Sequence, residues 1–260
     1  MRKVFALFLA GAAAFLVGTL SPQRMMATDD FQQLPGEERV ARARAARDKI
    51  IRERFQEAGL TYPPREIFLR WFKKEAAIEL WARAESEPFR LVNSYAILAH
   101  SGGPGPKRRE GDRQVPEGFY EIDRFNPESL FHLSMRLNYP NASDRVLSDP
   151  EQPGSDIYIH GKNLSLGCAP IGDDSIEELY LIALDVCTGG QSRIPVHIFP
   201  ARMGGPEWTR FSADAIAGDP SLERFWEQLQ PGYDFFESRH RLPKITVAAD
   251  GTYVMSATTE

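Results

Sequence analysis

The stretch that decides the fold is IFLRWFKKEAAIELWARAESEPFRLVNSYAIL, residues 67–98. Aromatic and branched side chains recur in it between short polar interruptions, a composition typical of β-strands. The segment KKEAAIELWARA, residues 73–84, is also compatible with a helix by propensity alone. We expect two or three antiparallel strands here, and therefore a domain organised around a β core.

Further strands are predicted downstream by alternating side chains. They cover LFHLSMRLNYPN, DIYIHG and RIPVHIFP, and a last hairpin over residues 244–255 turns at Asp250-Gly251. In LFHLSMRLNYPN the two faces of the strand are separated into an apolar row, Phe131, Leu133, Met135 and Leu137, and a polar row, His132, Ser134, Arg136 and Asn138.

Helices are predicted on either side of these strands. Helical patterns cover residues 35–59 and 219–240, the second interrupted near Pro231. Another helix opens with a capping box from Ser175 to Glu178. A glycine- and proline-rich connection runs over residues 100–116, a length typical of functional loops. Together the patterns predict one mixed α+β domain with a β core and flanking helices.

The composition limits the class of protein. The chain has 260 residues, 42% of them hydrophobic and 26% charged, which is enough for one substantial core. A net charge of −5 provides no basic field for nucleic acid. No CxxC or HExxH spacing suggests a metal site. We therefore expect neither nucleic acid as a partner nor a dedicated metal.

The N-terminus has the features of an export signal. MRK is a short basic start, and residues 4–20 form an uncharged apolar run. Cleavage could follow Ser21 or Ala27, but neither site is a clean A-x-A, so an uncleaved membrane anchor through residues 4–20 stays open. In both cases we expect the rest of the chain to work in the periplasm or cell envelope.

One histidine and one cysteine lie close together in IYIHGKNLSLGCAPI, residues 157–171. His160 ends a predicted strand, and the following turn can bring Cys168 back towards its ring. A cysteine reacts as a thiolate, which needs a nearby base or positive potential. The Gly161 carbonyl could hold the imidazole tautomer, and Gly167 leaves room for a substrate carbonyl at the backbone amides. The alternative is a structural histidine beside a buried cysteine.

The second cysteine lies in a different context. Cys187 continues the apolar stripe of the helix that opens at Ser175, so a core position explains it most simply. In an oxidising compartment, a disulfide between Cys168 and Cys187 is the competing interpretation. It would make the chain a disulfide-stabilised secreted domain without a reactive thiol.

The stretch IYIHG…SLGC resembles the signature of YkuD-type L,D-transpeptidases, and more closely their branch named after YafK. The similarity extends through SGGPGPKRREGDRQVPEGFY, NPESLFHLSMRLNYPN, GCAPIGDDSIEELYLI and GQSRIPVHIFPARM, roughly residues 66–203. It implies a YkuD-like β-sandwich core with flanking helices as a single catalytic domain. The chain then divides into a signal or anchor (1–27), a helical extension (28–62), the catalytic domain (63–203) and a C-terminal helix and β-hairpin (204–260).

The resemblance also implies the chemistry. Cys168 would be the nucleophile, His160 its base, the Gly161 carbonyl the group that orients His160, and the Gly167 and Cys168 amides the oxyanion donors. The substrate would be a peptidoglycan stem peptide with meso-diaminopimelate at its third position, joined to Cys168 as a thioester, and no cofactor is required. An amine acceptor would complete transpeptidation. Water would complete hydrolysis, which could release an attached lipoprotein.

Two departures from the family pattern affect the expected site. The usual second histidine, just before Gly-Cys, is Leu166 here, and the spacing from His160 to Cys168 is much shorter than in typical members. Weaker candidates for substrate binding are Arg136, His132, Asn138, Tyr158, His197 and Lys107. Arg136 suits a bidentate contact with a stem carboxylate, whereas Lys107 is expected to stay in water. A catalytically silent peptidoglycan-binding module is the rival from another class.

Overall fold

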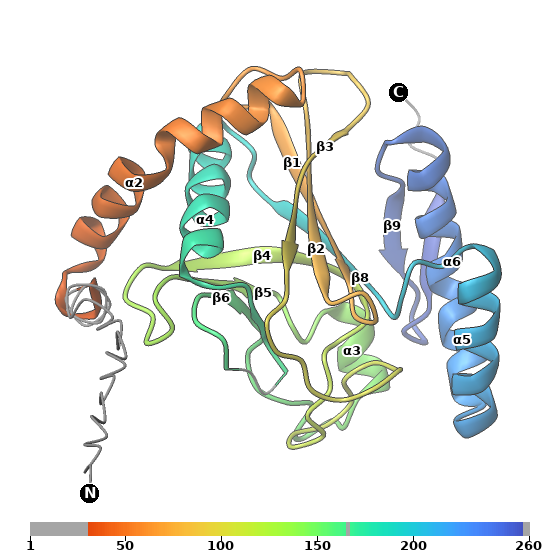
Figure 1. Cartoon of the computed structure of the whole chain (residues 1–260). Coiled ribbons are helices and arrows are strands. Elements are labelled where there is room, and N and C mark those ends of the chain that lie inside the picture. Colours follow the sequence, from red (N-terminus) through yellow and green to blue (C-terminus); the bar gives the residue numbers. More distant parts are fainter. Residues whose placement is uncertain (1–30, 165–166, 257–260) are drawn as a thin grey trace, which may run out of the picture.

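The computed structural model describes residues 31–164 and 167–256, which form a mixed α/β fold with helices on both sides of a large sheet (Figure 1). Eight strands pair in the order β3-β2-β1-β8-β4-β5-β6-β7. Their bounds are β1 (Glu66–Phe72), β2 (Ala77–Arg83), β3 (Arg90–Ala96), β4 (Gly118–Asn126), β5 (Ser134–Leu137), β6 (Tyr158–His160), β7 (Ala169–Pro170) and β8 (Ile194–Phe199). Strands β1 to β3 run steeply across β4, so the sheet curls (Figure 1). The predicted mixed α+β class is confirmed, with one curled sheet as its core.

Residues 67–98 form β1, β2 and β3, which pair antiparallel in sequence order. The prediction of strands is confirmed, and the helical alternative for residues 73–84 is wrong. Strand β1 is buried on both faces: Leu69 and Trp71 belong to the main core, whereas Phe68 and Phe72 pack on the opposite side. Because a strand covered on both faces needs no polar row, its sequence is an almost continuous apolar run.

One side of the sheet is covered by α2 (Gly36–Glu57) and α4 (Asp173–Thr188), which pack against each other. Helix α2 confirms the predicted N-terminal helix. Helix α4 begins earlier than predicted, after Gly172, whose φ of 83° is a left-handed conformation that glycine adopts easily. The predicted capping box is therefore wrong, and Ser175 lies inside the helix. The turn that leaves β7 determines where the helix begins.

The other side of the sheet carries the C-terminal part of the chain. Its elements are α5 (Gly205–Gly218), α6 (Ser221–Arg239), β9 (Lys244–Val247) and β10 (Tyr253–Ser256). The hairpin is confirmed, with Gly251 in its turn at a φ of 85°. Helix α6 continues through Pro231, so the predicted interruption is wrong. Leu229 and Tyr233, on either side of the proline, are buried in one apolar cluster that holds the helix in place. Helix α5 was not predicted.

Strand β5 is shorter than the alternation over residues 130–141 predicts. His132 has a φ of 76°, a left-handed conformation that a strand does not accommodate, and the strand begins only at Ser134. Phe131 therefore does not continue the buried apolar row, and this part of the prediction is wrong. After β5, Asn141 and Asp144 form a capping box that begins α3 (Ala142–Leu147), a helix that was not predicted.

Two expectations from the sequence lie outside the described residues: the export signal or anchor at residues 1–27, and the effect of Leu166. Within residues 31–164 and 167–256, no helix has the length and apolar character needed to cross a membrane. The domain boundaries stay predictions. All eight strands of the large sheet lie between Glu66 and Phe199.

Candidate active site

His160 ends β6 and Cys168 directly precedes β7, the two strands at one edge of the sheet. Strands β6 and β7 pair in parallel, with Ile159 opposite Ala169 and His160 opposite Pro170. Because side chains alternate along a strand, this register puts Cys168, which directly precedes β7, on the same face as His160. Both side chains line one pocket of about 610 Å³. The structure thus brings the two residues of the IYIHG…SLGC stretch together.

The His160 ring is buried and held by a hydrogen bond, with Nδ1 2.6 Å from the carbonyl oxygen of Gly161. A carbonyl oxygen can only accept, so Nδ1 carries the proton of the neutral ring and Nε2 keeps its lone pair. Burial lowers the pKa of His160, although the hydrogen bond to Gly161 acts in the opposite direction. At neutral pH the ring is therefore uncharged, with Nε2 as its proton acceptor.

The surroundings of Gly161 leave no room for a side chain. A Cβ at this position would lie 2.6 Å from Asp173 Oδ1 and 2.7 Å from His132 Cβ, both closer than real Cβ atoms approach. Its amide donates to the carbonyl of Leu133 at 3.2 Å. These contacts fix the carbonyl that accepts the proton of His160 Nδ1.

The two cysteines do not form a disulfide. The alternative of a Cys168–Cys187 bridge is therefore not realised, and Cys187 packs against the main core as expected. Burial raises the pKa of the Cys168 thiol, while a backbone hydrogen bond from Tyr158 and the charge of Lys107 oppose the shift. The thiol is thus protonated at neutral pH, and it needs a base before it can act as a nucleophile.

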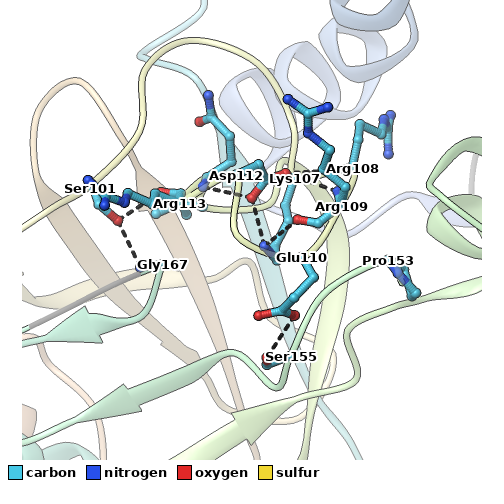
Figure 2. A network of polar contacts seen from close by, with 12 residues as sticks. Ser101, Lys107, Arg108, Arg109, Glu110, Asp112, Arg113, Pro153, Ser155 and Gly167 are labelled. Carbon is cyan, nitrogen blue, oxygen red and sulfur yellow. Dashed lines mark hydrogen bonds and ion pairs between the residues drawn. The ribbon is translucent and has the colours of Figure 1, made fainter. Parts of the chain in front are cut away.

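The backbone just before Cys168 is tied to the glycine-rich loop over residues 100–116. Gly167, at a φ of 95°, donates its N–H to Ser101 Oγ at 2.8 Å, and Ser101 Oγ donates to the Arg113 carbonyl at 2.8 Å (Figure 2). The neighbouring Asp112 accepts hydrogen bonds from three backbone amides of the loop. The predicted oxyanion donor Gly167 therefore already has a hydrogen-bond partner.

Lys107, in the same loop, is buried. Its Nζ donates to Asp112 Oδ1 at 2.7 Å and to the Arg109 carbonyl at 2.9 Å (Figure 2). The expectation that Lys107 stays in water is wrong, because the Asp112 carboxylate and a carbonyl replace the hydration of the ammonium group. Lys107 does not line the pocket of Cys168, but its charge acts on the thiol.

The pocket wall is mostly apolar. Its lining residues are Asn126, Ser129, Leu130, Phe131, Ser134, Tyr158, His160, Leu164 and Cys168. Leu130 and Leu164 are unusually exposed for leucine, at 82% and 69%, and Phe131 is 42% exposed. Of this set, Tyr158 and the His–Cys pair were expected from the sequence, and Ser134 belongs to the predicted polar row. The other lining residues were not expected. The sequence feature that indicates part of this wall is the presence of apolar side chains in loops beside the predicted strand ends.

Arg136 lies on the same sheet face as His160 but is already paired with carboxylates. It stands opposite Tyr158 in the register of β5 and β6. Its guanidinium donates to both Asp123 oxygens, at 2.9 and 2.6 Å, and to Asp156 at 3.3 Å. The hydrogen bond with Asp123 raises the pKa of Arg136 above its ordinary value. A substrate carboxylate would have to compete with two protein carboxylates for this group.

His132 and Asn138 lie away from the pocket. The His132 ring is buried, with Nε2 2.8 Å from Glu177 Oε1. Asn138 Oδ1 accepts the Glu121 amide at 3.0 Å, which joins the end of β5 to β4. The structure brings neither of these substrate-binding candidates to Cys168.

His197 is on β8 and faces the C-terminal side of the sheet. Its ring lies edge-on to the rings of Phe68 and Phe119, at 4.6 and 4.7 Å between centroids. Burial lowers the pKa of His197 to about 3, and the charge of Arg70 adds to the shift. An uncharged histidine inside an aromatic cluster is a core residue, so His197 is not brought to the site either.

Comparisons with known proteins agree with the geometry. The family described as the L,D-transpeptidase catalytic domain, YkuD, matches residues 82–198. The chain is 34% identical over 192 residues to the protein named "Putative L,D-transpeptidase YafK" of Escherichia coli K12, which covers 73% of this chain and 74% of that protein. The protein of the same name from Escherichia coli O157:H7 gives the same values.

Solved structures of lower similarity also match. The helical cell shape determining protein Pgp2 from Campylobacter jejuni has a TM-score of 0.42 and 17% identity, over 70% of this chain and 73% of that one. Bd1075 from Bdellovibrio bacteriovorus has a TM-score of 0.37 and 20% identity, over 63% and 56%. The extent and identity of the match to YafK establish the family, and this chain belongs to the YkuD-type L,D-transpeptidases.

Proposed function

We propose that this chain is a cell-envelope enzyme that transfers the acyl group of meso-diaminopimelate in peptidoglycan stem peptides through a thioester at Cys168. Membership of the L,D-transpeptidase family supports the reaction class. The observation that carries the assignment is the hydrogen bond from His160 Nδ1 to the Gly161 carbonyl, in the pocket that also holds Cys168. It leaves Nε2 as the proton acceptor on the face that the thiol occupies.

Acylation begins with transfer of the Cys168 thiol proton to His160 Nε2. The sulfur then attacks the carbonyl carbon of the diaminopimelate residue, and the carbonyl oxygen takes up the negative charge of the tetrahedral intermediate. When the intermediate collapses, the bond to the leaving amine breaks and the His160 proton moves to that amine. The products are a thioester on Cys168 and a free amine.

The oxyanion would be stabilised by the backbone amides of Gly167 and Cys168. The Gly167 amide donates to Ser101 Oγ at 2.8 Å, so in this proposal it exchanges a hydroxyl acceptor for the oxyanion. Anionic acceptors form stronger hydrogen bonds than neutral ones, which favours the exchange once negative charge has developed on the substrate.

The thioester is resolved by a second nucleophile. An amine of another stem peptide loses a proton to His160 and attacks the thioester carbonyl. The C–S bond then breaks, the Cys168 sulfur takes the proton back from His160, and the product is a cross-link; water in place of the amine gives a free carboxylate. The open, apolar pocket wall at Leu130, Phe131 and Leu164 leaves space for the group on the far side of the scissile bond. A peptide attached to diaminopimelate, including that of a lipoprotein, is a leaving group of suitable chemistry.

The test is mass spectrometry of products from the full-length chain. Diaminopimelate-containing muropeptides, free and lipoprotein-linked, are incubated with and without an amine acceptor, and Cys168→Ala is the matched control. Transpeptidation predicts cross-linked or amine-exchanged products that disappear in the control, and amidase activity predicts release by water with the same dependence. If the folded wild-type protein binds the muropeptides but gives neither product, the enzyme hypothesis is wrong and the catalytically silent binding module takes its place.

A further inference from the structure

One buried arginine connects the N-terminal helix α2 to a loop beside the active site. Arg39, on the first turn of α2, is only 5% exposed, and its guanidinium donates to main-chain carbonyls on two separate segments. These acceptors are the carbonyls of Leu34 and Gln32 on its own side, and of Pro127, Ser129 and His132 across the interface. A guanidinium has five N–H groups in a rigid plane, so this one side chain fixes the path of the loop over residues 127–132.

Other contacts of the N-terminal segment hold the same loop. The Phe31 ring stacks on the His132 ring with 3.7 Å between centroids. Gly36 approaches Pro127 so closely that a Cβ would lie 2.8 Å from Pro127 Cγ. His132 Nε2 is also joined to α2 indirectly, because its partner Glu177 accepts from Arg47 Nε at 2.7 Å. These contacts hold His132 in its left-handed conformation.

The loop carries part of the wall of the Cys168 pocket. Ser129, Leu130 and Phe131 all line it. The Phe131 ring lies 4.7 Å from the His160 ring, centroid to centroid, at an angle of 44°. His132, the next residue, has a left-handed backbone conformation. This conformation turns Phe131 out of the buried apolar row of β5 and towards His160. The position of Phe131 thus depends on the contacts that α2 makes.

We propose that α2 is a working part of the active site: Arg39 is a positioning residue that holds the loop over residues 127–132, and this loop sets Phe131 against the general base His160. The Gly161 carbonyl fixes His160 at Nδ1, and Phe131 restricts the ring from one side, so that Nε2 stays directed at the thiol. This inference rests on the proposed role of His160 as the base.

The test compares four variants of the full-length chain: Arg39→Ala, Arg39→Lys, His160→Ala and the control Lys49→Ala. Lys49 is on the same helix, but its side chain is 89% exposed, and among the residues that the structure describes its one ion pair is with Glu53, four residues later. Two readouts are used. Hydrogen exchange of the amides of residues 128–133 reports the loop, and the pH profile of Cys168 alkylation by iodoacetamide, read by peptide mass spectrometry with Cys187 as internal standard, reports the base.

Arg39→Ala is expected to raise loop exchange and to slow Cys168 alkylation at neutral pH by about tenfold, shifting its profile towards that of His160→Ala. Arg39→Lys, which keeps the charge but has fewer donors in a different geometry, is expected to lie between Arg39→Ala and wild type. Lys49→Ala is expected to match wild type. If Arg39→Ala folds and matches wild type in both loop exchange and alkylation profile, the proposal is overturned.

A second variant covers the case in which Arg39→Ala does not fold. Phe131→Ala removes a side chain that is 42% exposed, so the core is not opened. It is expected to shift the alkylation profile in the same direction, and an unchanged profile overturns the proposal. Neither readout uses a muropeptide. If the alkylation profiles of the variants shift but the wild-type protein forms no muropeptide product, the proposed substrate alone is wrong. If the wild-type protein forms product but the variant profiles do not shift, the positioning role alone is wrong.

Discussion

The two sides of the sheet are covered by helices that are attached in different ways. On one side, α2 is joined to α4 by ion pairs, Arg44–Asp185, Arg47–Glu177 and Arg54–Glu178, at 2.5, 2.7 and 3.0 Å. On the other side, α6 is packed through rings: Phe236 lies 4.9 Å from Phe68 and 5.0 Å from Trp81, centroid to centroid. A partly exposed ion pair such as Arg44–Asp185 contributes little net stability, whereas buried aromatic rings contribute several kcal/mol.

The difference indicates a division of roles. The C-terminal side supplies stability, and the N-terminal side supplies geometry to the pocket. The sheet also contains two histidines with different surroundings, His160 in the pocket and His197 among aromatic rings. These two histidines provide the sharpest contrast between the pocket and the aromatic core.

The largest effect is expected from His160. Because Nε2 is the proposed proton acceptor, His160→Ala should lower thioester formation at Cys168, per folded molecule, by about a hundredfold or more. The matched change at the second histidine of the sheet is His197→Leu, which removes a buried Nδ1 that has no hydrogen-bond partner among the described residues. It should leave the rate per folded molecule unchanged. Acylation of Cys168 by a labelled stem-peptide donor, followed by mass spectrometry, measures both.

The pH profile sharpens the same contrast. Since burial lowers the pKa of His160, the ring stays neutral below the ordinary histidine value of about 6.5. The acid limb of Cys168 alkylation should therefore fall below this value in wild type, whereas in His160→Ala the rate should follow the ionisation of the thiol itself, whose pKa burial raises. An acid limb above it would contradict the neutral-base assignment.

The next largest effect is expected on stability, in the aromatic cluster around Trp226 on the C-terminal side of the sheet. Trp226 is buried, stacks on Phe211, and donates from Nε1 to the Glu117 carboxylate at 2.7 Å. Trp226→Ala should lower the free energy of unfolding by about 3–5 kcal/mol, without changing the alkylation rate of Cys168 in the folded protein. Denaturant titration gives the stability. Trp208→Ala, at a half-buried neighbouring position, should cost less and serves as the control.

A smaller, pH-dependent effect is expected where α3 meets the C-terminal hairpin. Burial raises the pKa of Asp144 to about 6, despite hydrogen bonds from the Asn141 amide, the Tyr120 hydroxyl and Arg108. A raised pKa means that the native state binds this proton more tightly than the unfolded state. Its contribution to stability is complete below about pH 4 and is lost as the pH rises through about 6.

Asp144→Asn cannot titrate, so it should not lose this contribution. Across the same window the stability of the variant relative to wild type should rise by on the order of 2 kcal/mol. Urea unfolding at several pH values measures the difference. Parallel curves for the two proteins would show that Asp144 is ionised throughout.

The smallest effect is expected at the ion pairs of α2. Arg44 is partly exposed, and Asp185 also accepts the Tyr62 hydroxyl at 2.5 Å, so Arg44→Ala leaves the carboxylate with a partner. The free energy of unfolding should fall by about 0.5–1 kcal/mol at low salt, and by less at high ionic strength. Denaturant titration at two salt concentrations tests this. A loss as large as that of Trp226→Ala would break the distinction between the two sides.

Local patterns were sufficient for the elements that are periodic over their whole length. The apolar runs of β1 and β2, the stripe of α4 and the strand that ends at His160 were all predicted from spacing. The grouping of His160 with Cys168 was also predicted, because a glycine-flanked turn after a strand end limits where the chain can return.

What could not be predicted depends on contacts between distant residues. Arg39 bonds the His132 carbonyl across 93 positions of sequence, and the left-handed backbone there removes Phe131 from its alternating row. Lys107 is buried because Asp112 and Gly154 close around its side chain, although its own neighbours in sequence are charged or glycine-rich. Neither arrangement leaves a periodic signal.

The hydrogen bond between Gly167 and Ser101 has a consequence for selectivity in the proposed reaction. An amide that already has a hydroxyl acceptor gains little from a neutral substrate carbonyl, which is an acceptor of similar strength. An oxyanion is a stronger acceptor and gains more. The amide would therefore discriminate between ground state and transition state, because its binding energy is released only when the carbonyl oxygen carries charge.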